Sequence, residues 1–148
     1  MNWTHIMIHH SATVDSSTFS WSAIRKYHIM DPAHKWNDIG YHFGVEIVGT
    51  EYEALVGRPL DIKGAHCPQG GMNEKAIGIC LIGNFDIVIP NSAALKVLST
   101  RLLRPLMRLY SIIPQNIVFH RDFNFLKSCP GKLFTRELLA PYIPGGIV

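Results

Sequence analysis

Ala76-Ile77-Gly78-Ile79-Cys80-Leu81-Ile82 is a nearly continuous apolar run, and Gly83-Asn84 ends it with a turn signal. A strand with one face in water alternates apolar and polar residues, whereas a strand that is buried on both faces is apolar throughout. This stretch therefore predicts a strand deep inside a sheet whose two faces are both covered.

Further strands are indicated on both sides of this run in the sequence. His5–His9 is a short β-type run, and Asn116–Phe119 is the last such run in the chain. Tyr41–Val48 is rich in aromatic and β-branched residues. Gly49-Thr50 supplies a turn after it, so Tyr52–Val56 is expected to be its hairpin partner.

Helical patterns occur between these strands. In the first, apolar and aromatic residues recur at helical spacing from Trp21 to His28. Asp31-Pro32 is expected to end this helix, because the residue before a proline disfavours the α conformation. In the second, Asn91-Ser92 can cap a long helix whose leucines step by three or four, namely Leu95, Leu98, Leu102, Leu106 and Leu109.

Pro105 lies inside this long helical pattern and is expected to kink the helix or to end its regular part. Lys132–Leu139 predicts a short closing helix. Ser11–Ser20 and Gly57–Asn73 are expected to be loops, and the second is long enough to carry function. The chain has no repeats and no linker, so we expect an α/β fold in which residues 1–148 form a single domain.

The composition is that of a small globular protein. Apolar residues make up 47% and charged residues 17% of the 148 residues, which excludes a disordered chain. The net charge of +3 is mild and favours an anionic partner such as a cell-wall polymer. No Lys/Arg run with interleaved aromatics is present, so no nucleic acid is expected as a partner. No apolar run approaches the length that spans a bilayer, so no membrane insertion is expected.

The cysteines and the N-terminus bear on the compartment. Three cysteines argue against a closed disulfide framework and favour a reducing compartment during synthesis, although a bridge between Cys67 and Cys80 stays open. No basic segment followed by an apolar stretch is visible at the N-terminus, so a secretory signal is not expected. We therefore expect the protein to be cytoplasmic at synthesis.

A candidate zinc site is formed by His9, His120 and Cys129. His9 ends the first strand and His120 follows the last, so both imidazoles emerge at the same edge if these strands are neighbours. The loop from His120 to Cys129 is long enough to fold back and bring a thiolate to the same metal. Three protein ligands leave one position of a tetrahedral zinc open for water, which is the arrangement of a catalytic site. This pattern points to a metal-dependent hydrolase.

The spacing of these residues also has a simpler explanation. The chain has 8 histidines, most of which are expected only to pack or to cap, and a lone cysteine is usually a small buried apolar residue. Spacing alone leaves the choice between a metal site and ordinary packing open.

Several ordered motifs extend from about Ile6 to Phe134. They are Ile8-His9-His10-Ser11-Ala12-Thr13, Trp36-Asn37-Asp38-Ile39-Gly40-Tyr41-His42-Phe43, Val56-Gly57-Arg58-Pro59, Gly64-Ala65-His66, Asn73 with Ile77-Gly78-Ile79-Cys80-Leu81-Ile82-Gly83-Asn84-Phe85, His120-Arg121-Asp122, and Cys129-Pro130-Gly131. In these motifs the chain resembles the zinc-dependent N-acetylmuramoyl-L-alanine amidase family, which includes short bacteriophage amidases and the peptidoglycan recognition proteins. The resemblance implies a mixed central β-sheet flanked by helices.

The resemblance also implies roles for individual residues. It makes His9, His120 and Cys129 the ligands of Zn²⁺. Tyr41 matches the catalytic tyrosine, which would orient water or pass on a proton, and Lys127 matches the lysine that stabilises the oxyanion. Without the resemblance, Tyr41 would be interpreted as a packed strand tyrosine and Lys127 as a solvated lysine.

Four other polar residues receive different expectations. His66 borders the family's substrate groove, so the resemblance implies substrate contact. His10 alternates with His9 along the strand and is expected to point to the other face, with a supporting or packing role. Arg58 and Asn73 are expected to be structural, Arg58 at the hairpin and Asn73 in the long loop.

The reaction implied by the resemblance is hydrolysis of the amide bond between N-acetylmuramic acid and L-alanine of the stem peptide of peptidoglycan. Zinc would activate the water, Lys127 would hold the oxyanion, and Tyr41 or a water would deliver a proton to the leaving amine. A phage or prophage endolysin fits best, acting on the cell wall after its release from the cytoplasm. We expect a monomer, although nothing in the sequence fixes the oligomeric state.

Three other functions remain open at this stage. The first is a recognition module without catalysis, although such proteins typically lack the cysteine ligand. The second is a cytoplasmic amidase that recycles anhydromuropeptides, although such enzymes generally carry extra inserts that are not obvious in this compact chain. The third is a regulatory role, because one relative of the phage type also binds its phage RNA polymerase.

Overall fold

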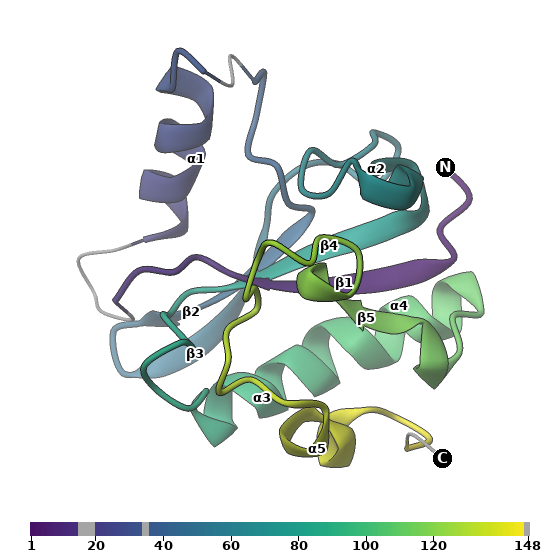
Figure 1. The fold of residues 1–148 in the computed structure, drawn as a ribbon. Helices are drawn as coiled ribbons and strands as arrows, with labels where there is room; N and C mark the ends of the chain where they lie inside the picture. The colour runs from purple at the N-terminus through teal and green to yellow at the C-terminus, as the bar shows by residue number, and fades with distance from the viewer. Residues whose placement is uncertain (15–19, 34–35, 147–148) are drawn as a thin grey trace.

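The computed structural model describes residues 1–14, 20–33 and 36–146. Its centre is a five-stranded sheet with the strand order β3-β2-β4-β1-β5 (Figure 1). The strands are β1 (His5–His10), β2 (Phe43–Val48), β3 (Glu51–Val56), β4 (Ala76–Leu81) and β5 (Ile117–Phe119). The β1, β2, β4 and β5 strands are joined by parallel pairing, and only the β2–β3 hairpin is antiparallel. The expected α/β fold with a mixed central sheet is thus confirmed.

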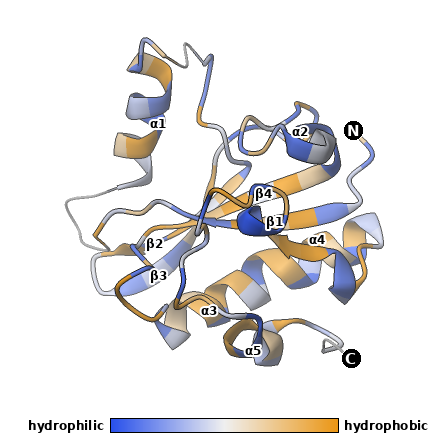
Figure 2. Ribbon diagram, in the orientation of Figure 1, coloured by the Kyte–Doolittle hydropathy of each residue, from blue (hydrophilic) through white to orange (hydrophobic). Residues whose placement is uncertain are grey.

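The apolar run that begins at Ala76 occupies the middle of this sheet. All six residues of β4 are buried, and the strand pairs with β1 on one side and β2 on the other. A continuous apolar strand is stable here because helices and loops cover both of its faces. Figure 2 shows the hydrophobic residues concentrated along β4 and on the adjacent helices.

Helices lie on both sides of the sheet (Figure 1). One long helical segment consists of α3 (Ser92–Val97), a π-helical part (Leu98–Leu103) and α4 (Arg104–Tyr110). It lies on the same side as α5 (Arg136–Leu139), whereas α1 (Trp21–Met30) and α2 (Met72–Lys75) lie on the other. The side that carries α3 and α4 holds the main core.

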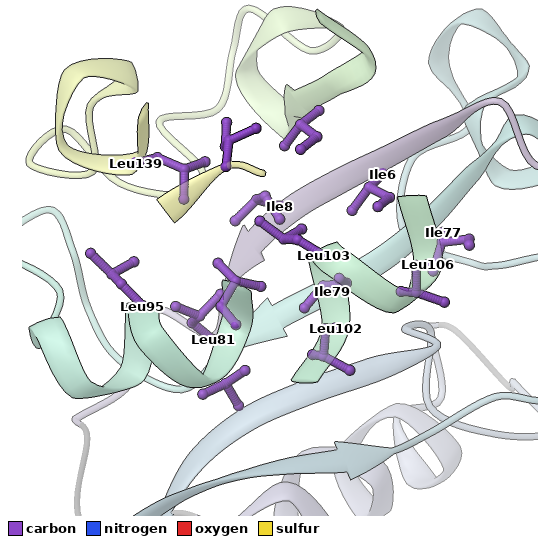
Figure 3. Packing of buried hydrophobic residues seen from close by; sticks show 14 of the residues in the cluster. Ile6, Ile8, Ile77, Ile79, Leu81, Leu95, Leu102, Leu103, Leu106 and Leu139 are labelled. Carbon is purple, nitrogen blue, oxygen red and sulfur yellow. The ribbon is translucent and has the colours of Figure 1, made fainter. Parts of the chain in front are cut away.

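Alternation along the strands assigns their side chains to these two sides. Leucines of the long helical segment pack against alternate residues of β1 and β4 (Figure 3). The residues labelled there are Ile6, Ile8, Ile77, Ile79, Leu81, Leu95, Leu102, Leu103, Leu106 and Leu139. The intervening residues, among them His9 and Cys80, therefore face the side of α1 and α2.

The face toward α1 has a close approach between a helix and a strand. A side chain on Gly44 would lie 2.5 Å from the ring of Trp21, so only glycine leaves room for that ring. The indole Nε1 of Trp21 also donates a hydrogen bond to the carbonyl oxygen of Val56 at 3.0 Å. Trp21 thus holds α1 against the β2–β3 hairpin.

Three expectations about secondary structure need correction. The strand expected from Tyr41 begins at Phe43, and the loop expected over Gly57–Asn73 contains a short helical turn and the start of α2. The closing helix expected over Lys132–Leu139 begins only at Arg136. The loop expected over Ser11–Ser20 lies in part outside the described residues, because 15–19 are not described.

Two further expectations concern cysteines and membranes. Cys67, Cys80 and Cys129 are all free thiols, so the possible bridge between Cys67 and Cys80 is not formed. Within the described ranges, no helix combines the length and the apolar character that crossing a bilayer would require.

Candidate metal centre and active site

Two distant segments of the chain bring His9, His120 and Cys129 together. The β1 and β5 strands are parallel neighbours, so His9 near the end of β1 and His120 directly after β5 reach the same edge of the sheet. Cys129 returns to this edge at the end of the following loop. One potential ligand atom from each residue lies within 4.8 Å of the other two. The Cys129 Sγ is 3.6 Å from the His9 Nδ1, and the rings of His9 and His120 have centroids 4.7 Å apart.

The protonation of the two histidines suits metal binding. His9 is 1% exposed, and burial, more than its histidine neighbours, holds its pKa well below the usual value. Burial, followed by the charges of Lys127 and His10, lowers the pKa of His120 to about 4. Both rings are therefore neutral near pH 7, and a neutral imidazole offers a lone pair to a metal.

Cys129 is 9% exposed, and burial raises the pKa of its thiol to about 12. Such a thiol is protonated in the metal-free protein and must release its proton when a metal binds. Two imidazoles and one thiol form a donor set that zinc accepts readily. The three residues thus fit a zinc ion with one position left for a non-protein ligand.

Arg121 holds the loop that carries Cys129. Its backbone N–H donates to the carbonyl oxygen of Cys129 at 2.8 Å. Its guanidinium donates to three further carbonyl oxygens, at 3.2, 2.7 and 2.8 Å, which belong to Ser128, Gly131 and Phe134. One side chain therefore fixes the backbone on both sides of the thiol.

Asp86, from the loop after β4, supports the same segment. Its carboxylate accepts hydrogen bonds from the Ser128 hydroxyl at 2.8 Å and from the Lys132 N–H at 2.9 Å. Gly131 has a φ of 113°, and a side chain there would lie 2.4 Å from the backbone of Phe85. The turn after Cys129 therefore requires glycine for both its conformation and its space.

Tyr41 lies beside this group, just before β2. Its ring centroid is 5.0 Å from that of His9, and the side chain is partly buried. Burial, with smaller contributions from Cys80 and Cys129, raises the pKa of Tyr41 well above its usual value. The phenol therefore keeps its proton at neutral pH and can act as a hydrogen-bond donor.

A hollow of about 310 Å³ opens next to Tyr41. Its lining is mainly apolar and comes from α1 and from the segments after β1 and before β2; the lining residues are Ser11, Thr13, Ala23, Ile24, Tyr27, His28 and Tyr41. A ligand in this hollow would lie in contact with Tyr41.

Lys127 is exposed and lies two positions before Cys129 in the loop. Its backbone N–H donates to the carbonyl oxygen of Asn124 at 3.0 Å. The charge of Lys127 contributes to the lowered pKa of His120 and also acts to lower that of Cys129. The ammonium group therefore acts electrostatically on the metal-ligand residues and is open to solvent.

His66, for which substrate contact was expected, lies inside the protein and not on an exposed groove. It is 8% exposed, and both ring nitrogens have partners within the protein. Its Nδ1 is 3.0 Å from the Nε2 of His9, and its Nε2 is 3.1 Å from the carbonyl oxygen of Ala76. Its ring thus contacts a candidate metal ligand directly.

The remaining polar residues have structural partners. The Nδ1 of His10 accepts a hydrogen bond from the N–H of Phe85, on the face opposite His9. Arg58 donates to the carbonyl oxygens of Asp38, Ile39 and Lys63. The side-chain oxygen of Asn73 accepts hydrogen bonds from the backbone N–H groups of His66 and Cys67, both at 2.8 Å.

Sequence reasoning gave no role to Arg121, Asp86 or His42. His42 is fully buried, and its Nδ1 accepts a hydrogen bond from the N–H of Gly78 in β4. Arg121 follows a proposed ligand directly and belongs to the motif His120-Arg121-Asp122, and these two facts could have indicated its role. No comparable signal indicated the role of Asp86, because Asp86 is distant in sequence from the loop around Cys129 that it supports.

Comparisons with known proteins agree with this geometry. A family profile described as N-acetylmuramoyl-L-alanine amidase matches residues 1–132. The endolysin of Escherichia phage T7 is 38% identical over 81 residues, covering 55% of this chain and 48% of the endolysin. The solved structure of the N-acetylmuramoyl-L-alanine amidase LysC from Clostridium intestinale is 29% identical, with a TM-score of 0.75. It covers 95% of this chain and 85% of LysC.

The peptidoglycan-recognition protein LB of Drosophila melanogaster is also similar. It is 28% identical over 134 residues, which cover 88% of this chain and 56% of that protein. A structure of a point mutant of the Drosophila protein in complex with tracheal cytotoxin has a TM-score of 0.74 at 27% identity, covering 95% of this chain and 83% of the mutant chain. The chain thus spans about half the length of the curated relatives, the T7 endolysin and the recognition protein.

Proposed function

The chain belongs to the N-acetylmuramoyl-L-alanine amidase family, and from this membership we propose that it is a zinc-dependent amidase of peptidoglycan. The bond cut is the amide between N-acetylmuramic acid and the L-alanine of the stem peptide. The observation that carries this proposal is the convergence of His9, His120 and Cys129, whose ligand atoms lie within 4.8 Å of one another.

His9, His120 and Cys129 would hold the zinc. When bound, zinc makes water nucleophilic near neutral pH and polarises the carbonyl of the scissile amide. The protein keeps the two imidazoles neutral by burial, and Arg121 and Asp86 keep the cysteine loop in place. These contacts fix the ligands before any substrate arrives, which is what an efficient site requires.

Tyr41 and Lys127 would act on the substrate beside the metal. Attack on an amide carbonyl builds negative charge on oxygen, and the ammonium of Lys127 offers a positive charge at the open side of the site. The leaving amine needs a proton, and the phenol of Tyr41 holds one at neutral pH because burial raises its pKa. Each residue therefore supplies a group that the zinc ligands cannot supply.

The hollow beside Tyr41 would receive part of the peptidoglycan substrate. Its apolar lining suits the faces of sugar rings or the stem-peptide side chains. Structures of similar recognition proteins contain tracheal cytotoxin, a monomeric diaminopimelic acid-type peptidoglycan. A muropeptide is thus the ligand class that we propose for this chain.

The similarity to phage endolysins supports a lytic role. In this role the protein would be made in the cytoplasm and would reach the cell wall after release. Relatives also include peptidoglycan recognition proteins, so a binding module is the main rival function. The presence of the Cys129 thiol beside both histidines favours catalysis over recognition alone.

Digestion of purified sacculi, followed by mass analysis of the products, tests the proposed function. We expect free L-alanine amino termini and glycan without stem peptides, and a chelator is expected to stop their release. New reducing sugar ends would instead indicate a glycosidase, whose chemistry requires paired carboxylates. Binding to sacculi without any products would support the recognition module.

A further inference from the structure

His66 and His9 form a buried hydrogen-bonded pair whose polarity can be deduced. The Nε2 of His66 is 3.1 Å from the carbonyl oxygen of Ala76, and a carbonyl oxygen can only accept. The Nε2 of His66 must therefore carry the proton. The Nδ1 of a neutral His66 is then an acceptor, so the Nε2 of His9, 3.0 Å away, must be the donor.

The same proton arrangement leaves the other nitrogen of His9 without a proton. With its proton on Nε2, a neutral His9 has a lone pair on Nδ1. This Nδ1 is the atom that lies 3.6 Å from the Cys129 Sγ, in the group with His120. His66 is 8% exposed, and burial disfavours the charged form of an imidazole.

We propose that His66 is a positioning residue that locks His9 in the tautomer whose Nδ1 can bind zinc. The carbonyl of Ala76 orients His66, and His66 in turn orients His9. This inference rests on the proposed zinc site and adds to it the group that prepares its first ligand. Metal-binding histidines commonly donate their second N–H to a carboxylate, a backbone carbonyl or a water, which fixes the ring and increases its basicity. Here the acceptor is the Nδ1 of His66.

Two glycines make room for the imidazole of His66. A side chain on Gly78 would lie 2.5 Å from the Cδ2 of His66, and one on Gly64 would lie 2.4 Å from the same atom. Gly78 lies inside β4, where glycine is unfavourable unless another group approaches closely. Here the ring of His66 is that group, which explains a glycine in the most buried strand of the sheet.

The loop backbone around His66 is equally fixed. Asn73 accepts hydrogen bonds from the N–H groups of His66 and Cys67, and its own carbonyl oxygen accepts one from Gly64 at 2.8 Å. The N–H of Ala65 donates to the carbonyl oxygen of Gly40 at 2.9 Å. A side chain held in this way has little freedom to follow a substrate, but it can hold another ring in place.

His42 provides a matched control. It is at least as buried as His66, and the centroids of the two rings lie 6.0 Å apart. The ring nitrogens of His42 are hydrogen-bonded to the backbone of Gly78 and Ile62 rather than to His9. A substitution at His42 therefore perturbs the same region of the core without removing the partner of His9.

The test combines NMR of the metal-free protein of residues 1–148 with zinc titration against a competing chelator. Correlations between ring protons and ring nitrogens report which nitrogen of His9 carries the proton. We expect the proton on Nε2 in the wild type and a mixture of tautomers in His66→Leu. The zinc dissociation constant of His66→Leu is expected to rise about 10- to 100-fold, as is typical when such a partner is lost.

Two further variants complete the design. His66→Asn keeps an acceptor oxygen near the position of Nδ1 and is expected to restore part of the zinc affinity. His42→Leu is expected to lower thermal stability while its zinc affinity stays close to that of the wild type.

A proton on Nδ1 of His9 in the wild type would overturn the inference. This measurement needs no variant, so it tests the inference even if His66→Leu does not fold. Wild-type zinc affinity in a folded His66→Leu protein would overturn it as well. A wild-type chain that binds no zinc would refute the proposed metal site. The tautomer of His9 would then still show whether His66 orients that ring.

Discussion

Among single residues, Cys129 contributes the ligand that distinguishes this site from a cluster of packed histidines. Its Sγ faces the Nδ1 of His9, and its backbone is fixed by Arg121. A thiolate is a stronger zinc ligand than a neutral hydroxyl, so the Cys129→Ser protein is expected to fold but to lose most of its zinc.

Metal analysis of the purified proteins checks this prediction. The wild type should contain about one zinc per chain, because three ligands define one site. Cys67→Ser is the matched control, since Cys67 is a buried free thiol that lies in an apolar cluster of the core and outside the ligand group. Equal zinc content and activity in Cys129→Ser and Cys67→Ser would refute the role of Cys129.

Lys127 and Tyr41 are separable from the metal ligands. Lys127→Ala and Tyr41→Phe are both expected to keep their zinc, because neither side chain belongs to the ligand group. Turnover should fall by about a hundredfold to a thousandfold for loss of an oxyanion donor, and by a similar order for loss of a proton donor.

The loss should appear in kcat rather than in KM, since both contacts strengthen in the transition state. Lys132→Ala is the matched control, because Lys132 is an exposed lysine of the same region. If Lys127→Ala changed only KM, Lys127 would bind substrate without stabilising the transition state. Full activity in both Lys127→Ala and Tyr41→Phe would show that Lys127 is only a surface lysine and that Tyr41 is only a packed tyrosine.

Among the structural elements, the loop between β5 and α5 decides where the thiol lies. Arg121 donates to carbonyl oxygens on both sides of Cys129, and its guanidinium lies 4.6 Å from the centroid of the Phe119 ring. Arg121→Met is expected to lower the free energy of unfolding by roughly 2 kcal/mol or more, because buried carbonyl groups lose a charged donor. It is also expected to weaken zinc binding, since the loop loses its anchor.

Arg136→Met is the matched control for this prediction. Arg136 also lies over the Phe119 ring, but its guanidinium is hydrogen-bonded to Ile117 and Asp122 rather than to the residues around Cys129. Denaturant unfolding and zinc competition would separate the two variants. Equal zinc affinities in Arg121→Met and Arg136→Met would show that Arg121 does not position Cys129.

The same loop shows why one helix boundary could not be predicted from sequence. The N–H groups of Lys132 and Leu133 donate to Asp86 and Phe85, which lie far away in the chain. Long-range hydrogen bonds thus hold the backbone in a non-helical conformation at the start of the segment where a helix was expected. The helix begins only after Thr135, whose side chain caps it.

The prediction that Pro105 interrupts the long helix is confirmed in part. Its position predicted an interruption of the long helix, and the structure has a π-helical segment over Leu98–Leu103 directly before α4. The N–H of Arg104 donates to the carbonyl oxygen of Ser99, one residue further back than in an α-helix. The helix does not end, because its leucines continue to pack on the sheet.

For the whole molecule, the main strands were predictable because burial on both faces leaves a continuous apolar run, and because aromatic and β-branched residues mark the strand after Tyr41. The candidate ligands were predictable because the two histidines lie at strand ends and all three residues lie in motifs of a known family. The role of His66 as the partner of His9 was not predictable, because the path of the loop around His66 depends on hydrogen bonds that Asn73 and Gly40 accept and on the space left by Gly78. Such contacts arise only when the whole chain has folded.

Several histidines that are neutral and buried make the stability of the metal-free protein depend on pH. Burial lowers the pKa of His42 to about 4, whereas a histidine in the unfolded chain titrates near 6.5. Between these two values the unfolded protein binds a proton that the native protein does not. The free energy of unfolding is therefore expected to fall as the pH falls from about 6.5 toward about 4, by about 1.4 kcal/mol per pH unit for each such histidine.

Denaturant unfolding of the metal-free protein across this pH range measures the effect. His42→Gln should show a smaller slope than the wild type, because one titrating group has been removed. An unchanged slope would mean that His42 is not held in its neutral form by the fold.

Activity as a function of added zinc tests the central claim most directly. The metal-free protein is titrated with zinc while the release of L-alanine amino termini from sacculi is followed. The site formed by His9, His120 and Cys129 predicts no activity without metal, and a linear rise that stops at about one zinc per chain. Amidase activity that survives complete removal of zinc, or no activity at any zinc content, would contradict it.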